Sequence, residues 1–404
     1  MNGHWLLPPG VHHGALPLLL ARALRAFADG YVAVLLPVYL IALGFGAWEV
    51  GVLATATLLG SSCATLALGA WGHRFHRHQL ITGAALLMAA TGFAFGLAGG
   101  FWPLLLIAFA GTLNPSSGDV SVFLPLEHAR LADAAEGDAR TALFARYSLA
   151  GSLSAAFGAL AAALPAQIAA VTGLSMLAGL RCMFALYGAI GCAVWLLYRT
   201  LPRPHDSAPP PHAPLGPSRP VVVRLAALFS VDSFAGGMVV NARMALWLLQ
   251  RFDMSVAAAG RFFFWAGLCA AMSQLAAAPL ARRIGLVNTM VWTHIPASVC
   301  LIAAAFAPSM PLALGLLLVR ALLSSMDVPA RSAFVMSVVT PAERAAAASF
   351  TNVPRSLASA AGPVIGAGLF AAGMLAAPLV ACGVLKIAYD LALWRAFRQT
   401  GKAR

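Results

Sequence analysis

The sequence predicts an all-α membrane protein of about twelve transmembrane helices, in two six-helix bundles related by a pseudo-twofold repeat around a central cavity. The composition, the number of apolar segments and an internal repeat support this fold class. The chain has 404 residues, of which 61% are hydrophobic and 10% charged, and its mean hydropathy is +0.84. A soluble core cannot bury that share of apolar residues, so the chain is expected to lie in lipid.

Apolar stretches long enough to cross roughly 30 Å of hydrocarbon recur along the chain. Before the midpoint they cover residues 18–44, 48–70, 80–100, 103–126, 142–164 and 176–198. After it they cover residues 222–249, 258–281, 286–307, 311–333, 350–372 and 375–396. Turn-forming runs such as Gly44-Phe45-Gly46 separate them. Each half therefore supplies one bundle.

The second half repeats the first in the same order. The matched pairs are 140–158 with 344–362, Phe27-Ala28-Asp29-Gly30 with Phe234-Ala235-Gly236-Gly237, and Asp119-Val120 with Asp327-Val328. The separation stays at about 204 to 209 residues, which indicates a duplication. Because duplicated bundles can rock about a site between them, the repeat favours a solute transporter.

A polar, proline-rich stretch separates the two halves. It includes the run Pro209-Pro210-Pro211 and can neither span a membrane nor pack as a helix. We therefore expect an N-terminal bundle over 1–200, a cytoplasmic linker over 201–220 and a C-terminal bundle over 221–404.

The basic residues predict the orientation in the membrane. Nearly all Arg and Lys residues outside the spans fall on one side, including the linker and the C-terminal tail, so both termini are expected in the cytoplasm. The net charge of +13 then reflects topology, and nucleic-acid binding is not expected. A composition rich in Ala and Arg, with Lys386 and Lys402 as the only lysines, favours a bacterial inner (plasma) membrane.

The turn after the second span carries a family resemblance. Its sequence, Gly69-Ala70-Trp71-Gly72-His73-Arg74-Phe75-His76-Arg77, together with the six-plus-six pattern, resembles the major facilitator superfamily, and in character the drug/proton antiporter-like branch. Gly69, Arg74 and Arg77 match the signature of that superfamily. His73 replaces its acidic residue and His76 its second glycine, which alters the latch that the resemblance implies between the bundles.

Charged residues at membrane depth are candidates for function, because an unpaired charge in lipid is costly. Asp29 resembles the acidic residue that drug/proton antiporters place in the first helix, which implies a proton-coupling role. The alternative is a self-neutralising pair with Arg25, four residues earlier on the same helix face. Both interpretations stay open at this point.

The resemblance implies that the first, fourth, seventh and tenth spans line the cavity. Arg243 and Arg320 are expected at similar depths, where two guanidinium groups could hold a carboxylate or phosphate. The full predicted set for the substrate cavity is Tyr31, Tyr39, Asn114, Phe123, Asp232, Asn241, Arg243, Trp247 and Arg320.

Other charged residues are expected in gates or local pairs. Gate contacts are expected near the cytoplasmic ends of the spans, from Arg74, Asp119, Arg283 and Asp327. Expected pairs are Lys386 with Asp390, Glu127 with Arg146, and Glu343 with Arg355.

No motif in the chain indicates an enzyme. The sequence lacks HExxH, GxSxG and a P-loop, so we expect no catalytic residues, no cofactor, no metal site and no ATP-driven step.

The sequence favours proton-coupled export of a small organic solute by alternating access. The alternative is uptake or exchange of an organic anion bound by the intramembrane arginines. The expected partners are the solute, protons and the lipid bilayer, and the expected state is a monomer.

Overall fold

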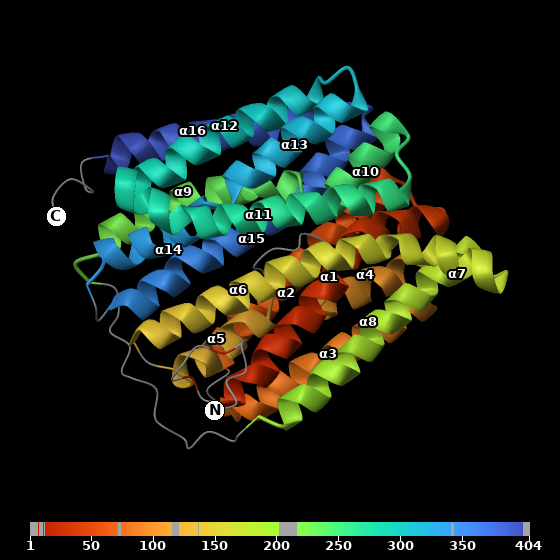
Figure 1. Ribbon diagram of the computed structural model, residues 1–404, viewed down its shortest axis with the longest axis horizontal. Helices are drawn as coiled ribbons and strands as arrows, with labels where there is room; N and C mark the ends of the chain where they lie inside the picture. The colour runs from red at the N-terminus through yellow and green to blue at the C-terminus, as the bar shows by residue number, and fades with distance from the viewer. Residues whose placement is uncertain are drawn as a thin grey trace.

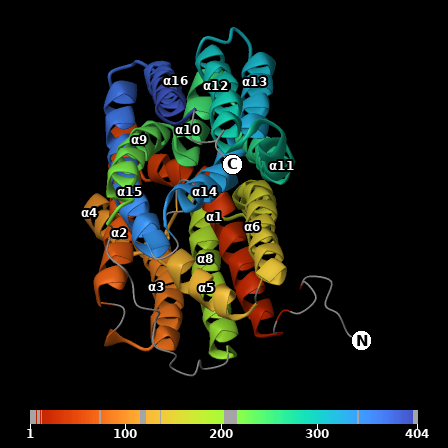
Figure 2. The ribbon, with the colours of Figure 1, turned by 90° about the vertical axis from the view of Figure 1, so that its left-hand side faces the viewer.

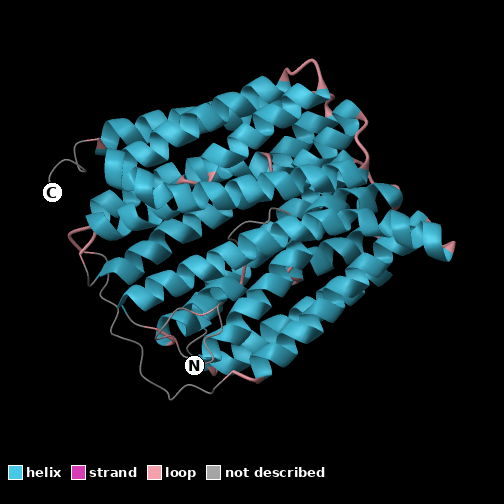
Figure 3. Ribbon diagram, in the orientation of Figure 1, coloured by secondary structure: helices cyan, strands magenta, loops and turns pink. Residues whose placement is uncertain are grey.

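The computed structural model describes residues 7, 11, 13–71, 74–114, 121–135, 137–201, 216–340 and 343–398. Secondary structure in this part of the chain is helical, with no strand (Figure 3). Before the linker the helices are η1 (His13–Ala15), α1 (Leu16–Ala42), α2 (Ala47–Trp71), α3 (Arg77–Leu97), α4 (Phe101–Ala110), α5 (Phe123–Asp133), α6 (Gly137–Leu160), η3 (Ala161–Ala163), α7 (Leu164–Thr172) and α8 (Met176–Arg199). After it they are α9 (Arg219–Met238), α10 (Asn241–Phe252), α11 (Val256–Ile284), α12 (Leu286–Ala305), α13 (Met310–Ser324), α14 (Asp327–Val338), α15 (Arg344–Ala371) and α16 (Ala377–Phe397).

The number of spans agrees with the prediction. Ten helical segments of the described chain are long and apolar enough to cross a membrane, and three of them combine consecutive helices: Ala142–Thr172, Arg219–Phe252 and Met310–Val338. The remaining two spans are α15 and the pair α4 with α5. The predicted twelve-helix fold class is confirmed.

The two sets of helices lie side by side. Figure 1 shows the helices before the linker, red to yellow, in the lower part of the molecule and those after it, green to blue, in the upper part. We call the end where α8 stops and α9 starts the linker end, and the opposite end the far end. The two sets meet where α15 packs along α2 and α11 packs along α6, on opposite sides in Figure 2.

The sequence repeat is visible as a repeated helix contact. A Cβ added at Gly30 of α1 would lie 2.1 Å from the carbonyl oxygen of Ala155 in α6, and one added at Gly237 of α9 would lie 2.2 Å from that of Ser359 in α15. Gly30 matches Gly237 in the repeat, and Ala155 matches Ser359. Only glycine permits two helix backbones to approach this closely, so both halves contain the same kind of helix–helix contact.

Three spans that were predicted to be continuous are interrupted. The seventh span breaks at Val239 and Val240, which leave helical geometry before α10 begins, and the tenth breaks at Ser325 and Met326. The fourth stops at Ala110. Non-helical backbone at membrane depth is tolerated where it borders a cavity or other protein. Val239 and Ser325 do line the central cavity.

The end of the linker is tied to the start of α15. The backbone N–H of Gly216 and the hydroxyl groups of Ser218 (2.5 Å) and Thr340 (2.6 Å) all donate to the carboxylate of Glu343. The hydrogen bonds from Ser218, Thr340 and Gly216 lower the pKa of Glu343 to about 2. Arg355, the partner expected for Glu343, donates from its Nε to the hydroxyl group of Ser233.

Glu343→Gln is expected to lower the melting temperature at neutral pH but not in strong acid. The folded-state pKa of about 2 lies below the ~4.3 of an unfolded glutamate. The ionised carboxylate therefore gives its full stabilisation of the folded state at pH values above the unfolded pKa. This contribution is lost as the pH falls through the folded pKa. Melting curves of both proteins between about pH 7 and pH 3 should show a gap that narrows with acid. Asp253→Asn, in the exposed loop after α10, is the control. A difference in melting temperature that does not change with pH would contradict the stabilising role of the ionised Glu343 carboxylate.

Candidate functional site

A cavity of about 280 Å³ lies between the two halves. Its lining residues come from α1, α6, α10, α11, α13 and the breaks that follow α9 and α13. They are Gly30, Ala33, Ser152, Ala155, Ala156, Ala159, Val239, Asn241, Met244, Phe262, Phe263, Ala266, Gly267, Ala270, Gln274, Leu317, Arg320, Ala321, Ser324 and Ser325. The volume is near the lower end of the ~300–1,000 Å³ typical of ligand sites.

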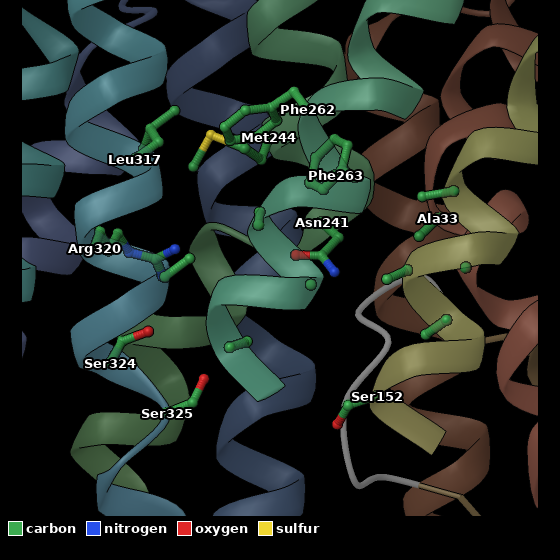
Figure 4. A pocket seen from close by; sticks show the side chains of 18 of the residues that line it. Ala33, Ser152, Asn241, Met244, Phe262, Phe263, Leu317, Arg320, Ser324 and Ser325 are labelled. Atoms are coloured by element: carbon green, nitrogen blue, oxygen red, sulfur yellow. The ribbon is translucent and has the colours of Figure 1, made fainter. Parts of the chain in front are cut away.

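Among the described residues that line the cavity, Arg320 is the charged one. It follows Leu317 by three residues and precedes Ser324 by four, so the three side chains share one face of α13. Figure 4 shows Arg320 and Asn241 extending into the cavity from different helices. Within the described chain, the Arg320 guanidinium has no hydrogen bond and no ion pair. A guanidinium placed in this way can bind an anionic group that enters the cavity.

Asp29 lies next to this lining, one residue before Gly30 on α1. It is partly buried, and no described residue hydrogen-bonds or ion-pairs with it. Arg25 pairs with Glu127 of α5. The side chain of Asp29 is not part of the cavity lining, and within the described residues no ion pair joins it to Arg25.

Glu127 is the centre of a buried cluster in the first half. Its carboxylate is fully buried and accepts hydrogen bonds from Arg25, Tyr147 and, at 2.5 Å, Tyr198. These four residues belong to α1, α5, α6 and α8. Arg146 was expected to pair with Glu127, but the partners observed for this carboxylate are Arg25 and the two tyrosines, which helix spacing could not reveal. Phe123, predicted in the cavity, instead stacks on Arg25 with 4.1 Å between the guanidinium carbon and the ring centre.

Asp232 is the centre of a second buried cluster, in the other half. Its carboxylate accepts from Lys386 at 2.6 Å and from Arg331 at 3.2 Å, and Arg331 lies 3.4 Å from Asp327. His294 lies 3.0 Å from Asp390 and 3.4 Å from Lys386. The predicted pair of Lys386 with Asp390 is therefore wrong. The cluster joins α9, α12, α14 and α16.

Among the predicted cavity residues, Asn241 and Arg320 line the cavity in this structure. The hydroxyl of Tyr31 donates to the carbonyl of Met183, and that of Tyr39 donates to the carbonyl of Phe95, so both face neighbouring helices of the first half. Trp247 is buried against Phe252. Asn114 is buried at the end of the stretch that follows α4.

Arg243 lies outside the lining, at the junction of α2, α10 and α15. It is 2% exposed, donates to the carbonyl of Pro363 at 3.2 Å and lies over the ring of Phe370. A Cβ added at Gly51 of α2 would be 2.7 Å from this guanidinium. The predicted two-arginine clamp is thus not assembled here, and Arg243 instead contacts the interface between the halves.

The predicted gating residues are dispersed. Arg74 and Arg283 are exposed at the linker end, and Asp327 pairs with Arg331. Asp119 and His73 lie outside the described residues. Sequence reasoning missed the lining residues of α11, of which Phe262, Phe263 and Gln274 are the largest, because the eighth span was not considered as a cavity wall.

Two halves of membrane-spanning helices with a cavity between them define the class of a solute transporter. The profile of the Major Facilitator Superfamily matches residues 18–242, more than half of the chain, so the chain belongs to this superfamily.

Comparisons with known proteins agree with that fold. An uncharacterized membrane protein of Saccharomyces cerevisiae is 23% identical over 378 residues, 84% of each chain. The crystal structure of a bacterial homolog of the human lysosomal transporter Spinster, inward-facing and occupied, has a TM-score of 0.73 at 19% identity and covers 95% of this chain and 97% of its own. That of a D-xylose-proton symporter has a TM-score of 0.70 at 16% identity and covers 94% and 97%. At these identities the structural likeness shows the fold alone.

Glu127→Gln is expected to lower the melting temperature strongly. The amide cannot balance the buried guanidinium of Arg25, and breaking a buried pair costs about 3–5 kcal/mol. The double variant Arg25→Met/Glu127→Gln removes the uncompensated charge and should recover part of the loss. Thermal unfolding of the three proteins in detergent checks this. Additive losses in the double variant would show that the pair is not coupled.

Proposed function

We propose that this chain is a secondary active transporter that carries a small organic anion across the membrane by alternating access. The observation that supports it most directly is Arg320, the charged residue of the cavity lining, whose guanidinium has no partner in the described chain. A partly buried cation without a counter-charge is costly at membrane depth, and a bound anionic solute would supply that counter-charge. Asn241 can add hydrogen bonds to the same group. This favours the anion alternative over a general exporter of organic solutes.

Asp29 supplies the proposed coupling to protons. Asp29 precedes the lining residue Gly30 and has no hydrogen-bonding partner in the described residues, which supports a role in which its carboxyl group gains or loses a proton as the cavity opens to one side or the other. In export, a proton taken up from outside would be exchanged for the solute. An acidic residue at this position of the first helix is what resembles the drug/proton antiporter-like branch.

Alternating access requires the contacts between the halves to open and close. Near the far end, Gly51 of α2 approaches Ala367 of α15, and Gly260 of α11 approaches Ala159 of α6. The basic residues Arg74, Arg282 and Arg283 are exposed at the linker end. By the positive-inside rule the linker end would be cytoplasmic, in a bacterial inner membrane, with the far end closed on the outside.

Arg320→Gln is expected to reduce the binding and transport of organic anions at least tenfold, because the variant loses a charge-assisted hydrogen bond worth ~1.5–3 kcal/mol. Arg320→Lys keeps the charge but lacks the planar guanidinium group, so its anion transport should lie between that of the wild type and that of Arg320→Gln. Uptake of labelled carboxylates into proteoliposomes is the measurement. Arg261→Gln, an exposed arginine of α11, is the control. Unchanged anion transport in Arg320→Gln would refute the assignment.

Asp29→Asn is expected to separate solute movement from proton movement. The amide cannot carry a proton, so transport driven by an imposed pH gradient should be lost. Exchange of labelled for unlabelled solute at equal pH should persist, because it needs no net proton transfer. The two assays are run on the same proteoliposomes. Gradient-driven transport at the wild-type rate would exclude Asp29 as the proton carrier.

A further inference from the structure

The cavity is polar toward the linker end and apolar toward the far end. On α13, Leu317 precedes Arg320 and Ser324 in a helix that starts at the far end, so the apolar residue lies farther from the linker end. The rise of ~1.5 Å per residue places Leu317 and Ser324 about 10 Å apart along the axis. Figure 4 shows the same separation, with Leu317 on one side of Arg320 and Ser324 and Ser325 on the other.

The other helices that line the cavity repeat this gradient. α11 also runs from the far end and presents Phe262 and Phe263 before Gln274. α10 runs the opposite way, and it presents Asn241 before Met244. α6 runs in that same direction and presents Ser152 before a series of alanines. Four helices therefore agree on one direction, which a chance scatter of polar residues would not give.

Small residues form the wall that faces these side chains. Gly30, Ala33, Ala155, Ala156 and Ala159 supply it from α1 and α6. None of them carries a hydrogen-bonding side chain, and the apolar end is completed by Met244, Phe262, Phe263 and Leu317. A hydroxyl group of a solute placed at this end would lose its water without gaining a side-chain partner, which costs about 1–3 kcal/mol.

We infer that the substrate is a small amphipathic anion that binds with its anionic group at Arg320 toward the linker end and its apolar body against Phe262, Phe263, Met244 and Leu317. This inference rests on the proposed function and narrows its substrate class. A polyhydroxylated acid of equal charge meets the same guanidinium, but it leaves its hydroxyl groups unpaired at the apolar end. The cavity of about 280 Å³ limits the body to a short chain or a single ring.

The test compares monocarboxylates that share one head group. Displacement of labelled benzoate from the purified protein is measured with acetate, butyrate, hexanoate and gluconate. Affinity is expected to rise about fourfold per added CH₂, the fold-change that corresponds to ~0.8 kcal/mol, until the cavity is full. Gluconate, with the same charge and six carbons, is expected to bind at least tenfold more weakly than hexanoate. Equal affinity for gluconate and hexanoate, or no rise along the series, would overturn the inference.

Two sets of variants separate this inference from the proposed function. Phe262→Ser and Leu317→Asn should each flatten the dependence of affinity on chain length. Two positions are used so that the loss of one variant through misfolding does not remove the test. Phe306→Ser, at an exposed position after α12, is the matched control.

Arg320→Gln should weaken the whole series equally. If Arg320→Gln has no effect, the proposed function fails; if it weakens all acids but chain length is irrelevant, only the amphipathic substrate class fails.

Discussion

The close contact between a glycine and a helix carbonyl, made once in each half, is the constraint on which the rest of the structure depends. Gly30 against Ala155 brings α1 onto α6, and Gly237 against Ser359 brings α9 onto α15. In lipid there is no hydrophobic effect between helices, so close van der Waals contact between small residues has to hold them together. Gly30 and Ala155 also line the cavity. The contact that builds the first half therefore also makes the smooth wall against which a substrate would lie.

Each half contains one buried cluster in which acidic and basic side chains neutralise one another. Glu127 is satisfied by Arg25 and two tyrosines, and Asp232 by Lys386 and Arg331. Each cluster joins four helices and stabilises one half without crossing to the other, so the halves can move as units. Against this background Arg320 and Asp29, which have no hydrogen bond or ion pair in the described chain, stand out beside the cavity.

The sequence predicted the properties that depend on composition and local pattern. Apolar length located the spans, and the repeat matched Gly30 with Gly237 because the two glycines meet the same steric demand. Partners could not be predicted in the same way. Lys386 was assigned to Asp390 by helical spacing, but its partner Asp232 is 154 residues away on another helix. The break at Val239 and Val240 was not predicted, although Gly236-Gly237 stands just before it, because valines themselves carry no turn signal and tertiary packing determined the local backbone.

In the proposed alternating-access cycle, Arg243 would oppose as well as support closure of the far end. Its guanidinium is buried where α10 meets α2 and α15, yet it makes one hydrogen bond, to the carbonyl of Pro363, and its Nε and Nη1 atoms have no partner among the described residues. Burial of a partly satisfied cation costs free energy, which is released if the far end opens and water reaches the group. The stacking on Phe370 and the close approach of Gly51 favour closure. These terms oppose each other in one place, and in the proposed transport cycle anion binding at Arg320 would shift the balance between a closed and an open far end.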